Sequence, residues 1–170
     1  MNVGFVGTGN MGFPMAANIL KAGHELTLFD ARPEATAELE RQGARLASDL
    51  PAGARAGDVV FDLSTVSPGS TRRLAARAAE RGVTLIDAPV SGSVSGARAG
   101  TLAVMIGAPR DVVAPYEPVL RAIGTSLFCL GEVGRGNVLK LLNNYGEASE
   151  QGLGTLDSSG LLKLLEPHRS

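Results

Sequence analysis

The sequence predicts an α/β fold with a doubly wound, mostly parallel sheet. Three observations lead to this prediction. Short apolar runs alternate with segments of helical periodicity, glycines separate the two, and the spacing repeats as strand, helix, strand. Strands and helices that alternate in this way form βαβ units, and right-handed crossovers wind such units into a parallel sheet with helices on both faces.

Six apolar runs are predicted to be strands because each is short and is bounded by turn residues. They are Asn2–Gly7, Glu25–Phe29, Val59–Leu63, Val83–Asp87, Leu102–Gly107 and Ser126–Leu130. The first run begins at the N-terminus without a basic leader segment, so we interpret it as a strand and not as a targeting peptide.

Four helices are predicted between these strands, over residues 10–22, 33–42, 68–81 and 110–123. In the first, Met11, Met15 and Ile19 recur every four residues and therefore share one face, and Gly23 follows at a position that favours glycine. A further helix begins over residues 138–144. Because later glycines (146, 152, 154 and 160) each lower helix stability by about 1 kcal/mol, we expect only a short C-terminal helical tail.

Composition and charge disfavour several functional classes. The chain has 170 residues with 16 basic and 17 acidic side chains, so it lacks the basic excess of a nucleic-acid-binding protein. Its single cysteine, Cys129, cannot form an internal disulfide or a thiolate metal site, and no metal site is predicted. No run approaches the roughly 20 apolar residues of a membrane span. We therefore expect a cytoplasmic protein that binds a small molecule and neither nucleic acid nor a membrane.

A glycine-rich turn follows the first predicted strand. Residues 7–12 are Gly-Thr-Gly-Asn-Met-Gly, the G-x-G-x-x-G pattern of a Rossmann-type dinucleotide-binding turn. The first glycine permits the tight turn, the second lets the backbone approach the pyrophosphate, and the third lets helix and strand pack closely. The predicted cofactor contacts around this turn are Gly7, Gly9, Asn10, Met11, Gly12, Asp30 and Arg32.

The aspartate that ends the second predicted strand indicates which cofactor is bound. Asp30 lies 18 residues after Gly12, where it would accept hydrogen bonds from the ribose hydroxyls of NAD and repel the 2′-phosphate of NADP. Arg32 could pair with that phosphate, so NADP stays open as the alternative. A structural glycine turn without a ligand is the competing interpretation, which the surrounding strand, helix and aspartate disfavour.

Four ordered blocks resemble one known family. Residues 4–16 (GFVGTGNMGFPMA) and 62–68 (DLSTVSP) form the first two, followed by residues 87–102, which begin DAPVSG, and residues 134–144 (G-x-G-x-x-x-K-x-x-N-N). Together they resemble the β-hydroxyacid dehydrogenase family, which contains 3-hydroxyisobutyrate dehydrogenase and tartronate semialdehyde reductase. This family belongs to the 6-phosphogluconate dehydrogenase superfamily and has its NAD-binding domain.

The resemblance implies catalytic roles for two residues of the last block. Lys140 would be the acid/base, and Asn144 would hydrogen-bond the substrate from one helical turn further along. Neighbouring branches of the superfamily fit less well. The 6-phosphogluconate dehydrogenases carry histidine where this chain has Asn143, and imine reductases usually lack the lysine.

The resemblance also implies binding roles in the two middle blocks. The substrate carboxylate would be held by Ser91 and Gly92 and the adjoining Ser93, a position where family members usually have glycine. Ser64 and Thr65 would lie near the nicotinamide end of the cofactor.

Two departures from the family pattern are expected to matter. Residues 57–61 resemble the family's fourth strand and residues 62–65 the end of its fifth, so a crossover unit of roughly 30 residues is predicted to be missing between them. The family also continues beyond the lysine block into an interdomain helix and a helical domain that closes the pocket and forms the dimer. We therefore predict a dinucleotide-binding domain over residues 1–137 and a remnant of the later elements over residues 138–170.

Two functions of different classes follow. The first is an NAD(P)-dependent oxidoreductase that transfers a hydride between a nicotinamide cofactor and a small 3-hydroxy acid resembling 3-hydroxyisobutyrate. The second is a truncated, non-catalytic nucleotide-binding remnant, because an open pocket would leave Lys140 hydrated and protonated. A second copy of the chain could also complete the pocket, so a homo-oligomer stays open.

Overall fold

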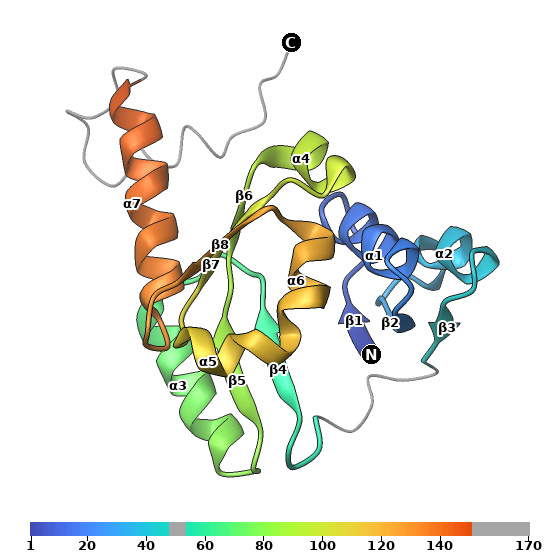
Figure 1. Ribbon diagram of the computed structural model, residues 1–170, viewed down its shortest axis with the longest axis horizontal. Coiled ribbons are helices and arrows are strands. Elements are labelled where there is room, and N and C mark those ends of the chain that lie inside the picture. The colour runs from blue at the N-terminus through green and yellow to red at the C-terminus, as the bar shows by residue number, and fades with distance from the viewer. Residues whose placement is uncertain (48–53, 151–170) are drawn as a thin grey trace.

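The N-terminal part of the molecule forms the first predicted βαβ unit (Figure 1). The computed structural model describes residues 1–47 and 54–150. β1 (Asn2–Val6) and β2 (Glu25–Phe29) are parallel, and α1 (Gly12–Lys21) connects them. After the short helices η1 (Pro33–Ala35) and α2 (Ala37–Arg41), β3 (Arg45–Leu46) extends this sheet beyond β2.

The second half of the chain builds the remaining strands. β4 (Val59–Asp62) is parallel to β5 (Thr84–Asp87), and α3 (Pro68–Ala79) connects them. The chain then forms β6 (Val90–Ser91), which is antiparallel to β7 (Ala103–Ile106), and β7 is parallel to β8 (Ser126–Cys129). Backbone hydrogen bonds from Gly107 to Asp87 (2.8 Å) and from Met105 to Pro89 (3.0 Å) join β7 to the end of β5. The predicted α/β class with mostly parallel strands is therefore confirmed.

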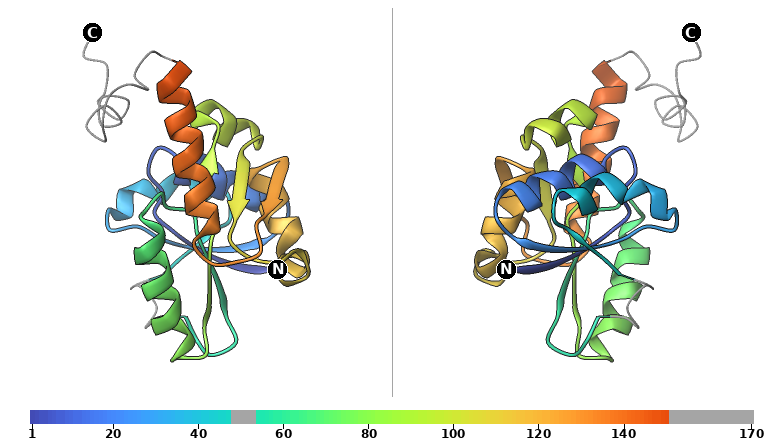
Figure 2. Two further views of the ribbon diagram at one scale, coloured as in Figure 1. Left: turned by 90° about the vertical axis from the view of Figure 1, so that its left-hand side faces the viewer. Right: turned by 90° about the vertical axis from the view of Figure 1, so that its right-hand side faces the viewer.

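Helices cover both sides of the strands in this second half. α3 and α7 (Arg135–Glu150) lie on the same side, where α3 packs on β5 and α7 packs on β5 and β7 (Figure 2). The chain between β7 and β8 forms α5 (Arg110–Val113), η2 (Ala114–Tyr116) and α6 (Glu117–Ile123), and α4 (Ser93–Ala99) follows β6. α1 contacts both α4 and α6, so it connects the two halves of the molecule.

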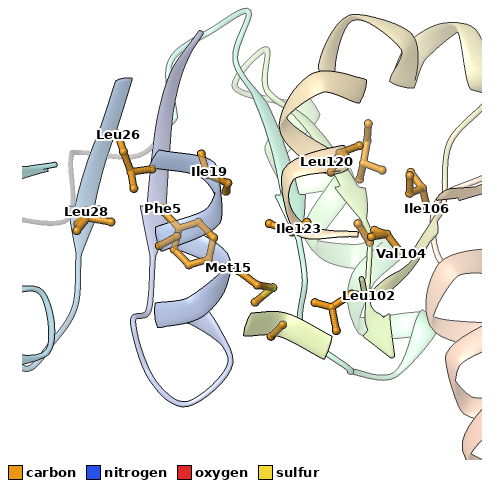
Figure 3. Packing of buried hydrophobic residues seen from close by; sticks show 14 of the residues in the cluster. Phe5, Met15, Ile19, Leu26, Leu28, Leu102, Val104, Ile106, Leu120 and Ile123 are labelled. Carbon is orange, nitrogen blue, oxygen red and sulfur yellow. The ribbon is translucent and has the colours of Figure 1, made fainter. Parts of the chain in front are cut away.

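One hydrophobic core extends across both halves. Met15 and Ile19 on α1 are buried, as their periodicity predicts, and they belong to the same cluster as Ile123 on α6 and Leu102 before β7. Figure 3 shows these side chains converging from α1 on one side and from α6 and β7 on the other. Helix packing therefore holds together the two sets of strands.

Among the described strands, none pairs with the second edge of β1. In a complete Rossmann-type sheet the strand order is 3-2-1-4-5-6, so the first strand lies between the second and the fourth. Here β1 is hydrogen-bonded to β2, and within the described residues no ladder joins it to β4. Val6, the last residue of β1, is 61% exposed. In the described part of the structure, this edge of β1 is therefore open.

Several helices differ from their predicted extent. The helix predicted over residues 110–123 is divided into α5, η2 and α6, because prolines at 115 and 118 interrupt the backbone hydrogen bonds. β3 and β6 are two-residue strands, too short to show a periodicity, and α4 lies within residues 87–102, where no helix was predicted.

The C-terminal helix is longer than predicted. α7 continues through Gly146 to Glu150, although a helix was expected only as far as Asn144. One interior glycine costs a helix about 1 kcal/mol but keeps both backbone hydrogen-bonding groups, so it weakens this 16-residue helix without ending it. The other three glycines of the predicted tail, at 152, 154 and 160, lie outside the described residues.

Candidate active site and cofactor turn

The glycine-rich turn has the geometry that its pattern predicts. Gly7 has a φ of 88°, which favours glycine, and its N–H donates to the Phe29 carbonyl at 2.8 Å. A Cβ at Gly9 would meet nothing within 4 Å, so this position leaves room for a ligand to approach the backbone. A Cβ at Gly12 would lie 1.8 Å from the Gly7 carbonyl oxygen, so helix and turn are in direct contact there. The residues present fit a dinucleotide.

Asp30 is held in place by the same turn. One carboxylate oxygen accepts from the Thr8 N–H at 2.7 Å and the Thr8 hydroxyl at 3.1 Å, and the other accepts from the Arg32 N–H at 2.9 Å. Hydrogen bonds from the Arg32 and Thr8 backbones lower the pKa of Asp30, and the nearby Arg32 guanidinium adds to this effect. Asp30 is therefore an anion at neutral pH, at the position predicted to select the cofactor.

A wide cavity of about 760 Å³ opens beside this turn. Its lining includes Gly9, Asn10 and Arg32, together with Arg98 from α4. The sequence did not single out Arg98, which reaches the cavity because Asn18 on α1 donates to the Ala97 carbonyl at 2.8 Å and holds α4 against α1. Two guanidinium groups beside the turn make this cavity suited to an anionic ligand.

Lys140 lies in a second cavity, of about 470 Å³. Its ammonium donates to the Ser91 hydroxyl at 3.2 Å, and Gly92, Ser93 and Met11 line the same space. The predicted acid/base, the carboxylate loop (residues 91–93, predicted to hold the substrate carboxylate) and Met11 of the glycine-rich turn therefore line one cavity, although they are far apart in the sequence. Met11 contributes to this cavity while Gly9 and Asn10 line the wide one, so the glycine turn contacts both.

The other predicted site residues, Asn144, Ser64 and Thr65, are absent from the linings of both cavities. Asn144 is half-buried on α7, one turn beyond Lys140. Ser64 and Thr65 are exposed after β4. Their predicted contact with the nicotinamide stays a prediction.

A buried polar cluster at the start of α7 was not assigned a role from the sequence. Asp87, at the end of β5, and Asn137, on α7, both have 0% exposure. The Gly134 and Asn137 backbone N–H groups donate to the Asp87 carboxylate at 2.7 and 2.8 Å. Both residues lie in blocks that resemble the β-hydroxyacid dehydrogenase family. The sequence feature that could have indicated a polar cluster here is the aspartate that ends an apolar strand.

Comparison with known proteins assigns the fold and the family. Residues 2–52 and 47–131 match the family described as the NAD binding domain of 6-phosphogluconate dehydrogenase. The chain belongs to this family. The predicted nicotinamide cofactor is confirmed at the level of the family, since its domain is an NAD-binding one.

Individual relatives of this 6-phosphogluconate dehydrogenase-type domain confirm the predicted β-hydroxyacid dehydrogenase resemblance. The 3-hydroxyisobutyrate dehydrogenase of Pseudomonas aeruginosa is 42% identical over 84% of this chain and 58% of its own length. The NAD-dependent L-serine dehydrogenase of the same organism is 36% identical over the same shares. The solved Mycobacterium tuberculosis 3-hydroxyisobutyrate dehydrogenase with L-serine has a TM-score of 0.84 and 32% identity, over 88% of this chain and 61% of that one. The chain thus spans about three fifths of the length of these relatives.

The missing crossover unit is visible in these alignments, but at another place than predicted. The P. aeruginosa alignment has 173 positions and uses 84% of this 170-residue chain, about 143 residues, so about 30 positions of the relative have no counterpart. The two stretches that match the family overlap at residues 47–52. The break therefore falls before β4, and its predicted place between Phe61 and Asp62 is wrong. β4 is accordingly an intact parallel partner of β5.

The described residues contain neither a helix suited to span a membrane nor a candidate metal site. Within residues 1–47 and 54–150, no helix combines the length and apolar character needed to cross a bilayer. The same part of the chain contains no group of three His, Cys, Asp or Glu side chains placed to share a metal ion.

Ser93, where the family resemblance predicts glycine, occupies a backbone conformation that destabilises the folded chain. Ser93 adopts a φ of 59°, and it is the only non-glycine residue with positive φ in the part of the chain that the structure describes. Ser93→Gly is expected to raise the free energy of unfolding by about 1 kcal/mol, because glycine adopts this conformation without strain. Urea denaturation measures the change.

Ser95→Gly is the matched control for this substitution. Its hydroxyl is 2.8 Å from that of Ser93, so both variants lose the same hydroxyl contact, but Ser95 has no positive φ. We expect Ser95→Gly to lower stability by about 0.5–1 kcal/mol, since glycine disfavours a helix. Equal effects of the two variants would contradict the assignment of strain to Ser93.

Proposed function

We propose that this chain carries the cofactor turn and the acid/base of an NAD-dependent oxidoreductase that transfers a hydride between nicotinamide and a small 3-hydroxy acid. The observation that supports this most is the 470 Å³ cavity that Lys140, Ser91 and Met11 line together. It brings a proton donor or acceptor, a hydroxyl for the substrate and the edge of the cofactor turn within one space.

The substrate class is inferred from the chemistry of this cavity and of the named relatives. Names among the relatives refer to 3-hydroxyisobutyrate and L-serine, which share a carboxylate and a hydroxyl on carbon 3. In this chain the Ser91 hydroxyl and the Gly92 backbone offer donors for the carboxylate, and Lys140 lies 3.2 Å from the former. A small acid with both groups would therefore place its hydroxyl near the Lys140 nitrogen.

The chain's own residues account for the proton transfer. A bound nicotinamide supplies the hydride acceptor for oxidation and the hydride donor for reduction. During oxidation the Lys140 amine takes the proton of the substrate hydroxyl, and during reduction the ammonium returns it to the carbonyl oxygen. The Ser91 hydroxyl orients the Lys140 nitrogen, and Asn144 on the same helix face adds a hydrogen bond to the substrate oxygen.

The cofactor would bind with its pyrophosphate over Gly9 and Asn10 at the start of α1. The N–H groups at a helix N-terminus favour an anion, and Arg32 and Arg98 line the adjoining cavity. Asp30 would accept from the ribose hydroxyls and favour NAD over NADP. A non-catalytic nucleotide-binding domain is the second candidate, favoured by the open edge of β1 and by the partial coverage of the relatives.

Titration with NADH and NADPH, followed by nicotinamide fluorescence, tests the cofactor proposal. NADH is expected to bind more tightly than NADPH. Asp30→Ser is expected to change the ratio of the two dissociation constants by about tenfold towards NADPH, because the carboxylate no longer repels the 2′-phosphate and Arg32 is released from it. Glu25→Ser, which removes a carboxylate from the other end of β2, is the control and is expected to leave the ratio unchanged.

Turnover separates the two candidate functions. If NAD is reduced in the presence of L-serine or 3-hydroxyisobutyrate, the non-catalytic proposal fails. If NADH binds and neither acid is oxidised, the chain is a nucleotide-binding domain without this activity. If neither NADH nor NADPH binds, both proposals fail.

A further inference from the structure

The first turn of α7 is anchored by a buried carboxylate. The two oxygens of Asp87 each accept one backbone N–H, from Gly134 at 2.7 Å and from Asn137 at 2.8 Å. Such groups at a helix N-terminus have no partner within the helix, and an anion there is stabilised by the helix dipole. Asp87 therefore sets the position and direction of the helix that carries Lys140.

The backbone of α7 approaches this carboxylate and β7 closely. A Cβ at Gly136 would lie 2.1 Å from the Met105 carbonyl oxygen and 2.9 Å from a carboxylate oxygen of Asp87. A Cβ at Gly107 would lie 2.0 Å from the other oxygen. Glycine at both positions lets α7 lie directly against β7 and around Asp87.

The Asn137 side chain ties the same helix to the segment after β4. Its carbonyl oxygen accepts from the Val66 N–H at 3.0 Å, and its amide nitrogen donates to the Thr71 hydroxyl at 3.2 Å. Val66 directly follows Ser64 and Thr65, the residues predicted to lie near the nicotinamide. One fully buried amide thus connects α7, the start of α3 and the segment proposed to contact the cofactor.

Asn137 also shares a helix stripe with the proposed catalytic residues. Asn137, Lys140 and Asn144 are separated by three and four residues, so they lie on one face of α7. A rotation or shift at Asn137 would therefore move the Lys140 nitrogen relative to the Ser91 hydroxyl, which belongs to β6.

We propose that Asn137, anchored by Asp87, is a positioning residue that sets the Lys140 nitrogen against the carboxylate loop and holds residues 64–66 against the same helix. It touches neither proposed ligand. Its effect on turnover rests on the proposed function, whereas its effect on the position of Lys140 does not.

The test compares Asn137→Ala with Leu39→Ala, which destabilises the core at α2, away from the site. Lys140 reactivity is measured with an amine-directed reagent, with Lys21 on α1 as the internal reference in the same sample. Deuterium uptake over residues 64–71 reports on the segment that Asn137 holds. Both readouts use the unliganded full chain and need no catalytic activity.

Asn137→Ala is expected to raise labelling of Lys140 relative to Lys21 by about threefold or more and to speed exchange over residues 64–71, since local opening exposes both. If the chain turns over a 3-hydroxy acid, kcat should fall by about 10- to 100-fold, with KM changed less, as for a misplaced catalytic group. Thr71→Val is expected to show a smaller change of the same kind, and Thr71→Ser should restore wild-type behaviour.

Unchanged Lys140 labelling in Asn137→Ala would overturn the proposal. An equal rise of Lys140 labelling in Asn137→Ala and Leu39→Ala would also overturn it, because it would indicate general destabilisation. Absence of turnover in the wild-type chain would refute the proposed function alone. The labelling and exchange results would still decide the positioning role.

Discussion

Replacing Lys140 with methionine is expected to lower kcat for oxidation of a 3-hydroxy acid by roughly 10²- to 10⁴-fold, the usual contribution of a general acid/base. Methionine keeps an unbranched apolar chain in the cavity but can neither accept nor donate the proton. NADH affinity should stay within about twofold, because Lys140 is assigned to the substrate and not to the cofactor. Steady-state kinetics with NADH fluorescence titration measures both quantities.

Lys21→Met provides the matched control for this change. Lys21 is exposed in the last turn of α1 and contributes to neither cavity lining, so its loss removes the same charge without touching the site. Its kcat should equal that of the wild-type chain. Retention of kcat in Lys140→Met would show that another group transfers the proton.

Gly12→Ala is expected to abolish saturable NADH binding. The new Cβ would lie 1.8 Å from the Gly7 carbonyl oxygen and 2.9 Å from its carbon, and both atoms belong to the backbone. The turn and α1 must therefore separate, which costs at the upper end of about 1–3 kcal/mol and displaces the N–H groups proposed to face the pyrophosphate. NADH titration and thermal denaturation measure the two effects.

Two further variants keep this prediction testable if Gly12→Ala fails to fold. Gly9→Ala adds a Cβ that meets no protein atom within 4 Å, so the fold should persist while the methyl group blocks the proposed pyrophosphate position. Gly4→Ala, in β1, also meets nothing within 4 Å and should bind NADH normally. Wild-type NADH affinity in Gly9→Ala would place the cofactor elsewhere.

Local patterns were sufficient to predict the first βαβ unit. The spacing of Gly7, Gly9 and Gly12 reflects three local requirements of one turn, and Asp30 follows at the end of the next strand. Met15 and Ile19 are buried because helical periodicity places them on one face. In each case the pattern that predicts the feature lies within a single strand–helix–strand segment, which is why sequence reasoning predicted it.

Other features depended on contacts between distant segments. Asp87 and Asn137 are 50 residues apart, and their pairing follows from the packing of α7 on β5 and β7, which periodicity does not reveal. The open edge of β1 likewise depends on which strands remain to pair with it.

The sequence by itself determined the α/β class, the family and the cofactor turn, because these are encoded in local spacing and in motifs that persist through the loss of about 30 positions. Only the tertiary structure decided that the Lys140 nitrogen lies 3.2 Å from the Ser91 hydroxyl oxygen and that, among the described strands, β1 has an open edge. It also decided that the buried Asp87 carboxylate orients α7. Those three features arise where separate segments meet, and the free energy of packing and of buried hydrogen bonds selects among arrangements that the sequence pattern leaves equally open.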